Sequence, residues 1–502
     1  DPTLILHLTE DQGQGRTIGH FFYSTDGVER LNSVLGNPMN SRTRWDGNTL
    51  EMTTTGKFGP NEIRLVDRYE LAAGRLVLRR HFEGQSPRGP MPAQDQVLIH
   101  EAVPLKAGVA RVDLTPRKML PLYGYANRKC GPAAVGLHDP LQAKVLILES
   151  ALQRIAIVTA DLGNLVSTRV GPAAKERHGV GLVLLAASHS HSAPTFTGQA
   201  EYLKEVEDNI LDAIGQAAQR MFPARLRTAR GTARLGYNRL VPREHGRVRA
   251  LFDNLERIPQ GPLDEEFQLI EVTDLAGESK ALLVHYAVHP VVLGTTNCLY
   301  SADFPGAMQS TIESAIPGTQ AMFVQGGAGD VNPILQGRSG NSEADFALVE
   351  RLGKLLADAV LKARPLLRVL EPASQAIQFE QETLRFADRW KKDAPAHEIG
   401  IATVRLGREL AIAALPGEPL HRLQKMWKED AAVSQALFYG YTYVGSGEWP
   451  SYLPDLRSAA LGGYGADNTT TFEPGAGERI IQRHLIHLFG LQGYWQAQPG
   501  QN

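Results

Sequence analysis

At 502 residues the chain is longer than one compact hydrophobic core usually supports, so we expect at least two domains. Its composition, 43% hydrophobic and 21% charged, is that of an ordinary globular protein. A net charge of -2 at pH 7 gives no general attraction for nucleic acid, and we expect no nucleic-acid partner. No charge-free apolar run reaches the about 18 residues of a membrane-spanning helix, although peripheral contact with a membrane stays open.

The first residues, DPTLILHLTE, contain no basic stretch followed by an apolar one, which a secretion signal would show. This start fits either a mature secreted form or a protein that never had a signal. Of the two, we expect a secreted or periplasmic protein from which the signal has been removed. Two cysteines, Cys130 and Cys298, allow at most one disulfide bridge. This number excludes a disulfide scaffold and a cysteine-rich zinc site.

Residues 1–103 have the alternating pattern of a small all-β domain. Apolar and charged residues alternate in NEIRLVDRYELAAGRLVLRRHFEG around an AAG turn, and Asp46-Gly47 occupies the position of a two-residue hairpin turn. A loop is expected in GQSPRGPMPAQDQ and a last strand in VLIHEAV. We expect an antiparallel domain, lipocalin-like or sandwich-like, with a packing or docking role, because it contains no cluster of catalytic residue types.

Residues 104–502 mix short apolar strands with amphipathic helices, which predicts a large α/β (α+β) domain. The expected strands are AKVLILE, IAIVTAD, VGLVLLAAS, ALLVHYAV and QAMFVQG. Apolar residues recur every three to four positions in EYLKEVEDNILDAIGQAAQRMF and in DFALVERLGKLLADAVLKA, as in helices that pack on a core.

Several polar residues stand where an expected strand ends, which is where loops present ligands above a rigid scaffold. Catalytic zinc takes three or four nitrogen or oxygen ligands from such positions. The candidates are His189 and His191 after GLVLLAAS, His289 after ALLVHYAV, Glu418 after LAIAALPG, and Asp330 and Asn332 after MFVQGGAG.

Each candidate also has a plain structural interpretation. A single histidine at a strand end is more often a hydrogen-bonded structural residue, and Glu418 after a Pro-Gly turn could be a solvated carboxylate. Because side chains alternate along a strand, His189 and His191 point to the same face, which makes a ligand pair as probable as a structural one. The GGAGD turn lacks the lysine of a nucleotide-binding loop, so that function is rejected.

Taken in chain order, ten segments resemble the neutral/alkaline non-lysosomal ceramidase family, a group of zinc-dependent amidases. They run collinearly from about residue 105 to about 465, and the order of the whole set is more specific than any one of them. The segments are AGVARVDLTP, LYGYANR, GLHDPLQAKVLILE, IVTADLG, SHSHSAP, YNR, AVHPVVLG, SADFPG, QGGAGDVNP and LPGEP. The resemblance implies a zinc-dependent hydrolase of an amide (N-acyl) bond, a role in sphingolipid or other lipid metabolism, and a lipid or N-acylated small molecule as substrate.

The family's ligand set implies Zn2+ held by His189, His289, Glu418 and a tyrosine. The tyrosine is placed at Tyr452 by SYLPDLRSAALGGY, in which Tyr464 follows twelve residues later. Because the preceding GYTYVGSGEWP looks like a local insertion, Tyr441 and Tyr443 stay open as the ligand.

The resemblance also implies the roles of the remaining site residues. Arg239 of YNR matches an arginine near the family's active site, and His191 would transfer a proton to the leaving amine. The carbonyl is attacked by a metal-activated water, with Tyr464 or Asn332 assisting the oxyanion. Asp330 is expected to orient a ligand or shape its turn.

Two departures from the family affect the expected substrate. The family reads Gly-Asp-Val-Ser-Pro, with a serine regarded as essential, where this chain has GDVNP and Asn332. An amide is no nucleophile, so covalent acyl transfer through this position is excluded. We also expect an N-terminal β domain and no C-terminal immunoglobulin-like domain of the kind that the longer ceramidases carry. These departures leave two alternatives: an esterase or amidase for a soluble compound, or a non-catalytic binding homologue, which the retained ligand types disfavour.

Overall fold

The computed structural model describes residues 3–10, 16–25, 27–34, 37–72, 75–100, 105–150, 153–243, 246–370, 377–467 and 469–494. The chain divides into two units, Asp1–Val103 and Pro104–Trp495, and each is described by itself. Among the described residues, no helix combines the length and the apolar character that crossing a bilayer requires.

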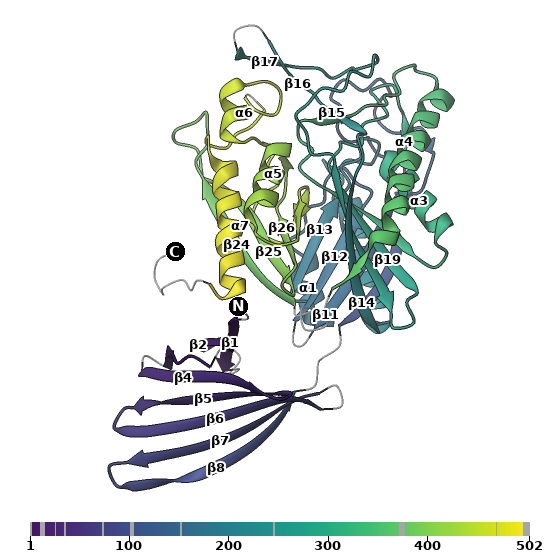
Figure 1. Ribbon diagram of the computed structural model, residues 1–502. Coiled ribbons are helices and arrows are strands. Elements are labelled where there is room, and N and C mark those ends of the chain that lie inside the picture. The colour runs from purple at the N-terminus through teal and green to yellow at the C-terminus, as the bar shows by residue number, and fades with distance from the viewer. Residues whose placement is uncertain are drawn as a thin grey trace. The chain divides into compact units, whose positions relative to one another are not determined.

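The N-terminal unit contains one six-stranded antiparallel meander, in which each strand pairs with the next along the chain (Figure 1). Burial alternates along its strands, as expected for a sheet with two different faces. The strands are β3 (Arg30–Val34), β4 (Asn37–Asp46), β5 (Thr49–Phe58), β6 (Asn61–Ala72), β7 (Arg75–Ser86) and β8 (Gly89–His100). A separate pair consists of β1 (Thr3–Glu10) and β2 (Arg16–Ser24). The expected small all-β region is therefore confirmed.

Two local predictions in this unit were wrong. The residues expected to form a loop, GQSPRGPMPAQDQ, are mostly strand: β7 extends to Ser86 and β8 begins at Gly89. Its Pro90 and Pro92 are tolerated because β8 is an edge strand of the described sheet. The hairpin turn after β4 lies one residue later than expected, since Asp46 pairs with Thr49 and leaves Gly47 and Asn48 as the turn. Residues 73 and 74 of the AAG turn lie outside the described residues.

The second unit is built on a ten-stranded mixed sheet. Along one path the strand order is β21-β19-β18-β14-β9-β11-β12-β13-β29, with β23 (Arg368–Val369) pairing to β14. The strands of the path are β9 (Lys106–Asp113), β11 (Gln142–Ser150), β12 (Gln153–Ala160), β13 (Leu182–Ala187), β14 (Phe222–Thr232), β18 (Glu266–Asp274), β19 (Ser279–Tyr286), β21 (Gln320–Gln325) and β29 (Thr442–Tyr443). All five strands expected from the apolar runs are present, which confirms the mixed-sheet prediction.

A second sheet packs against the first. Its order is β24 (Ile377–Phe386), β25 (His397–Leu406), β26 (Leu410–Ala414) and β28 (Gln435–Tyr439). One buried cluster joins Leu146, Ile157 and Leu184 of the large sheet with Val404 and Ile412 of the small one. The five strands that carry these residues are buried along most of their length because both of their faces are covered.

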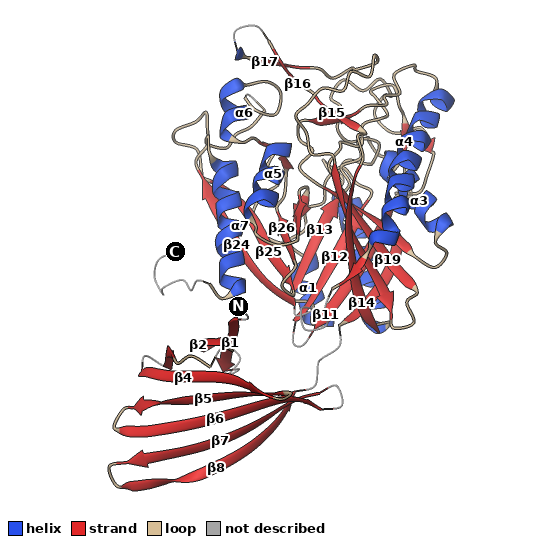
Figure 2. Ribbon diagram, viewed as in Figure 1, coloured by secondary structure: helices blue, strands red, loops and turns tan. Residues whose placement is uncertain are grey.

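Helices cover the outer faces of the two sheets (Figure 2). On the large sheet these are α1 (Val170–His178), α2 (Ala200–Gln219), α3 (Asp303–Ala315) and α4 (Ser342–Ala363). On the small sheet they are α5 (His421–Asp430) and α7 (Ala476–Gln492). The unit is therefore layered helix-sheet-sheet-helix, and α2 and α4 match the two helices expected from apolar spacing.

Three parallel strand pairs run through these sheets: β12 with β13, β19 with β21, and β26 with β28. Polar residues come shortly after three of these strands: Ser188 directly follows β13, His289 lies three residues after the end of β19, and Glu418 lies four residues after the end of β26. The carboxyl ends of buried strands therefore support the site described below.

Candidate metal centre and catalytic pocket

His189 follows β13 in a strained conformation. Its φ of 71° lies in the left-handed region, which costs a non-glycine residue about 1–3 kcal/mol. The surrounding structure holds it there: the backbone N–H donates to Leu162 O at 2.9 Å, and the ring Nδ1 lies 2.6 Å from Gly163 O. A carbonyl can only accept, so Nδ1 carries the proton and Nε2 presents a bare lone pair.

His289 has the same arrangement. Its Nδ1 lies 2.6 Å from Ala328 O, which again leaves Nε2 without a proton. Burial lowers the pKa of His289 to about 4, so the ring is neutral at pH 7. A neutral imidazole with its second nitrogen hydrogen-bonded is the form in which histidine binds a metal.

Glu418 brings a carboxylate to the same point. It begins the short strand β27 (Glu418–Pro419), and its Oε2 lies 3.1 Å from His289 Nε2 and 3.4 Å from His189 Nε2. Burial alone would raise the pKa of Glu418, but His189 and His289 hold it well below its usual range when either ring carries a proton on the Nε2 that faces it. Two bare imidazole nitrogens and an ionised carboxylate, with no thiol among them, fit a zinc ion.

His191 lies as close to this point as the three residues above, with its Nε2 3.3 Å from His189 Nε2. The ligand atoms of His189, His191 and His289 all lie within 4.8 Å of one another. Unlike the other two rings, His191 has a buried Nδ1 with no hydrogen-bond partner among the described residues. It therefore lacks the outer hydrogen bond that usually orients a metal-binding histidine, and a proton-transferring role suits it better.

The structure distinguishes between the three tyrosine candidates. Tyr452 pairs with Glu418 in parallel register, between β27 and β30 (Tyr452–Leu453), and lines the pocket. The Tyr441 ring packs 4.6 Å from the His189 ring, and its buried hydroxyl has no partner in the described part of the chain. The Tyr443 hydroxyl instead donates to Gly447 O, and its ring belongs to the core beside α2. The geometry therefore favours Tyr452 or Tyr441.

Arg239 lies buried beside Tyr452. Its Nη1 donates to Asn332 Oδ1 at 3.2 Å and its Nη2 to Gly329 O, so the donor end of the Asn332 amide is directed away from the guanidinium. Burial would lower the pKa of Arg239, but Tyr452 and Glu418 raise it above its ordinary value. Its guanidinium also lies 5.2 Å from the ring centre of Tyr464, which is 40% exposed. Arg239, Asn332 and Tyr464, the three catalytic candidates that are not histidines, thus lie together.

Asp330 holds this region together from behind. Its Oδ1 accepts from the backbone N–H of His421 and its Oδ2 from His421 Nδ1 and Asn238 Nδ2, at 2.7–2.9 Å. Its own carbonyl accepts from the Arg239 N–H. Asp330 therefore connects the segment of Arg239 with the start of α5, three residues after Glu418, and does not itself line the main pocket.

Sequence reasoning assigned no role to the loop that forms another wall. Tyr123 and Tyr125 place their rings edge-on against His191, at 5.7 and 4.8 Å. Gly124 between them has a φ of +96°, and a Cβ there would lie 2.3 Å from the His191 ring. The motif LYGYANR was the available signal, but its spacing alone does not show that it packs on the histidines.

Cys130 and Cys298 form a disulfide that joins this loop to residues 294–298. Arg128 reinforces the connection, because its guanidinium donates to the backbone oxygens of Tyr123, His191 and Asn297. Both loops line the pocket, so the bridge fixes one wall of the site.

The pocket above His189, His289 and Glu418 has a volume of about 490 Å³. Its lining combines charged, amide and aromatic side chains: Tyr125, His191, Arg239, Phe252, Asp253, His289, Asn332, Arg338, Tyr452 and Tyr464. All eight predicted site residues are thus brought together around this pocket: six line or border it, and His189 and Glu418 lie directly beneath.

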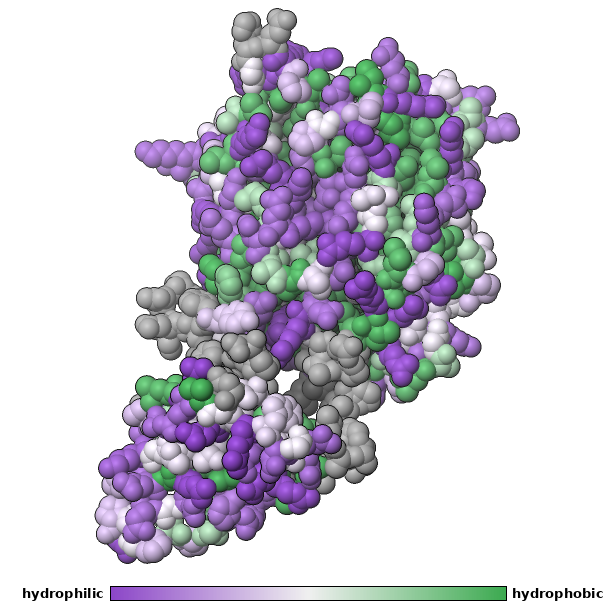
Figure 3. Space-filling model, viewed as in Figure 1, coloured by the Kyte–Doolittle hydropathy of each residue, from purple (hydrophilic) through white to green (hydrophobic). Residues whose placement is uncertain are grey.

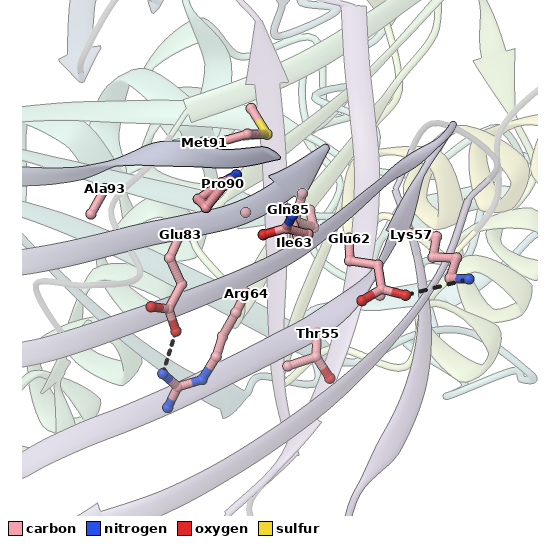
Figure 4. Close-up of a pocket in the computed structure, with 12 residues that line it drawn as sticks. Thr55, Lys57, Glu62, Ile63, Arg64, Glu83, Gln85, Pro90, Met91 and Ala93 are labelled. Atoms are coloured by element: carbon pink, nitrogen blue, oxygen red, sulfur yellow. Dashed lines mark hydrogen bonds and ion pairs between the residues drawn. The ribbon is translucent and has the colours of Figure 1, made fainter. Parts of the chain in front are cut away.

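A larger groove, of about 620 Å³, lies on the N-terminal sheet over Gly56 and Gly84 (Figure 4). Its charged side chains neutralise each other, as Arg64 does with Glu83 at 2.6 Å and Lys57 with Glu62 at 3.4 Å. It contains no convergent histidines, so we place the chemistry in the smaller pocket on geometric grounds.

Comparison with known proteins finds similarity to ceramidases in part of the sequence and in the fold. No family model matches the chain. Neutral ceramidase A of Dictyostelium discoideum is 27% identical over 176 residues, which cover 31% of this chain and 24% of that protein. The chain thus aligns with about a quarter of its curated relative.

Solved structures show the same fold. Neutral ceramidase from Pseudomonas aeruginosa superposes with a TM-score of 0.64 and 18% identity, covering 79% of this chain and 76% of the other. A ceramidase complexed with C2 gives the same TM-score and coverage at 16% identity. The resemblance of the chain to the neutral ceramidase family, expected from its ten motifs, is thereby confirmed.

Proposed function

We propose that the chain is a zinc-dependent hydrolase that cleaves a linear amide (N-acyl) bond of a ceramidase-like substrate. The observation that carries this proposal is the convergence of His189 Nε2, His289 Nε2 and Glu418 Oε2 beneath a pocket that also contains Arg239 and Asn332. Tyr452 is the proposed fourth ligand, with Tyr441 as the alternative. The fold shared with ceramidases and the partial sequence match support the same class of reaction.

A bound zinc ion would polarise the scissile carbonyl and make water a strong nucleophile near neutral pH. Proton transfer and stabilisation of the oxyanion depend on side chains of the protein. His191, neutral because burial lowers its pKa, is placed to take a proton and pass it to the amine nitrogen as the C–N bond breaks. Water provides the oxygen of the new carboxylate, so no covalent acyl-enzyme is needed.

Asn332 stands where the family has its serine. Because Arg239 occupies its Oδ1, the NH2 end of the amide is the part that can donate to a developing oxyanion. Tyr464 lies next to Arg239, and its hydroxyl offers a second donor beside the Asn332 amide. Arg239 orients both groups and keeps a positive charge near the developing negative one.

We propose that the protein is secreted or periplasmic. Its support is the Cys130–Cys298 disulfide, since such bridges persist in oxidising compartments. A soluble amide or ester remains the alternative substrate, and a binding-only homologue is the alternative outside catalysis.

The test is hydrolysis of a fluorogenic N-acyl substrate before chelation, after chelation and after zinc is restored. We expect turnover that disappears with the metal and returns with it. Turnover that survives complete removal of the metal would contradict the proposal. Metal binding without turnover of N-acyl or ester substrates would favour the binding homologue.

A further inference from the structure

One buried glutamine stands at the end of a strand of the large sheet, next to the segments of the candidate metal ligands. Hydrophilic side chains are spread over the surface of the second unit on the face that Figure 3 shows, where they meet water. Gln325 has no exposed surface, although it ends β21, the parallel neighbour of the strand that leads to His289. A primary amide is seldom buried without hydrogen bonds, so its partners indicate what it does there.

The Gln325 amide connects the two segments that carry the candidate histidine ligands. Its Nε2 donates to Ser188 O at 3.2 Å and to Val288 O at 2.9 Å. These carbonyls belong to the residues directly before His189 and His289. Because a carbonyl can only accept, only the NH2 end of the amide can bond both, which determines the orientation of the side chain. One side chain on a third strand thus holds two ligand segments at a fixed separation.

Backbone pairing within the sheet does not make this connection. In the strand order of the large sheet, β21 and β19 stand at one end and β13 stands next to the other. Among the described residues, β12 pairs with β13 and β19 pairs with β21, but β13 pairs with neither β19 nor β21. Because Gln325 nevertheless reaches Ser188 O, its side chain joins two strands that the hydrogen-bond ladder leaves apart.

The turn that follows Gln325 also fixes the position of His289. Ala328 O accepts from Nδ1 of the His289 ring at 2.6 Å, and Val331 O accepts from the His289 backbone N–H at 3.0 Å. The first bond orients the ring and the second holds its backbone. Both the strand end and the turn after it therefore serve the same ligand.

The turn also lies against the segment of the candidate carboxylate ligand. The Gly329 N–H donates to Pro419 O at 2.9 Å, directly after Glu418. A Cβ at Gly329 would lie 2.6 Å from Glu418 O, so only glycine permits this close approach. We name residues 325–331 the brace, because they contact the segments of all three candidate ligands.

The other end of the Gln325 amide shows that its role is not packing. Its Oε1 is buried and has no hydrogen-bond partner among the described residues. An unpartnered buried amide oxygen destabilises a fold, and an apolar side chain of similar volume would avoid that cost. What an apolar side chain could not supply is the pair of Nε2 bonds to the two histidine segments.

We propose that Gln325 is a positioning residue for the metal centre, because its bonds to Ser188 O and Val288 O set the separation of His189 and His289. It does not touch the metal or the substrate. This inference rests on the proposed function and deepens it, because it names the side chain that preorganises two of the proposed ligands. Donors held at the bonding separation before the metal arrives bind it more tightly than donors that must be gathered.

The test is the zinc dissociation constant of the full chain, measured by competition with a chelator of known affinity. We compare Gln325→Met with a matched control, Gln320→Met, at the other end of the same strand. Gln320 is 5% exposed, and its Nε2 donates at 3.2 Å to Val145 O in β11, a strand that contributes no residue to the pocket. We expect zinc binding about tenfold weaker in Gln325→Met and unchanged in Gln320→Met.

Thermal unfolding of the metal-free proteins separates positioning from a general loss of stability. Both methionine variants should melt at a lower temperature, because each loses a buried, hydrogen-bonded amide, but only Gln325→Met should lose zinc affinity. Gln325→Glu and Gln320→Glu keep the size of the side chain and replace this pair if methionine prevents folding. A carboxyl group offers one hydrogen at most, so Gln325→Glu should also bind zinc more weakly than its control.

Equal zinc affinity in the Gln325 and Gln320 variants would overturn the proposal. If the unaltered chain binds zinc and hydrolyses an N-acyl substrate while Gln325→Met binds zinc as tightly, only the positioning role is refuted. An unaltered chain that binds no zinc would refute the proposed function, and the positioning role with it.

Discussion

The two units of this protein use charged residues in opposite ways. On the N-terminal sheet, arginines and glutamates face each other across strands, as Arg44 and Arg68 do around Glu51 at 2.9 Å. In the larger unit, Glu418 meets two imidazoles whose Nε2 atoms carry no proton, and the Arg239 and Tyr441 side chains keep buried atoms without hydrogen-bond partners in the described residues. Charge density is higher in the first region, yet the second has the unfilled bonding capacity that a metal or a substrate requires.

The difference explains why the larger groove is not the candidate active site. A matched, exposed ion pair contributes about 0–1 kcal/mol and leaves nothing for a ligand to satisfy. A buried polar group without a partner costs about 1–3 kcal/mol, so it persists only where something compensates. The following changes test whether the two regions differ as described.

The largest effect is expected from His289→Ala. Losing one of two bare imidazole donors should remove the bound metal and reduce turnover by at least about 10³-fold. Elemental analysis and turnover with a fluorogenic N-acyl substrate check this. His484→Gln is the matched control: that histidine is equally buried but lies within α7, on its buried face. It should lower stability while leaving zinc content intact, and metal retained by His289→Ala would place the centre elsewhere.

Asn332→Ala should cost about 10²–10³-fold in kcat, the loss typical of one oxyanion donor, with zinc content unchanged. Asn332→Ser keeps a donor and introduces the residue that the resemblance implies for the family, so its loss should be smaller. Steady-state kinetics on the two variants distinguish an oxyanion donor from a residue that only shapes its turn. An Asn332→Ala protein as active as the unaltered one would show that the position only shapes its turn.

Removing the disulfide by Cys130→Ser/Cys298→Ser should destabilise the second unit by about 2–4 kcal/mol. Because the bridge and Arg128 hold a pocket wall and not the metal donors, KM should rise several-fold more than kcat falls, with zinc retained. Denaturation and kinetics on the same preparation measure both. Equal loss of zinc would show that the wall also supports the ligands.

The smallest effect is expected in the N-terminal unit. Asp67→Asn breaks a two-bond contact with Arg80, at 2.8 Å each, on the buried face of the sheet, and should destabilise that unit by about 1–2 kcal/mol. Thermal unfolding followed by circular dichroism reports the change. Asp67→Asn should not change turnover or zinc content. Its control, Glu83→Gln on the exposed face, should leave the melting temperature unaltered.

Much of the fold could be predicted from local pattern. Continuous apolar runs identified five of the ten strands of the large sheet, and three-to-four-residue spacing identified α2 and α4. The loop expected after residue 84 was wrong because glycines and prolines dominate GQSPRGPMPAQDQ. An edge strand accepts prolines that a central strand would reject, and sequence alone does not show which strand lies at the edge.

The candidate site was less predictable than the fold. His189, His289 and Glu418 could be named because each follows a strand, and the ten ordered motifs connected them. The protonation of the two histidine rings could not be predicted, since it depends on Gly163 O and Ala328 O, which come from other segments. Nor could the exposure of Leu255 and Ile258, which is a property of the folded surface.

The measurement that tests the central claim most directly is the zinc content of the purified protein, compared with that of Glu418→Gln and His289→Ala. The account predicts about one zinc per chain in the unaltered protein and a large loss in both variants. An unaltered protein that binds no zinc when zinc is supplied would show that the convergent histidines and carboxylate are structural, and the proposed chemistry would fall with them.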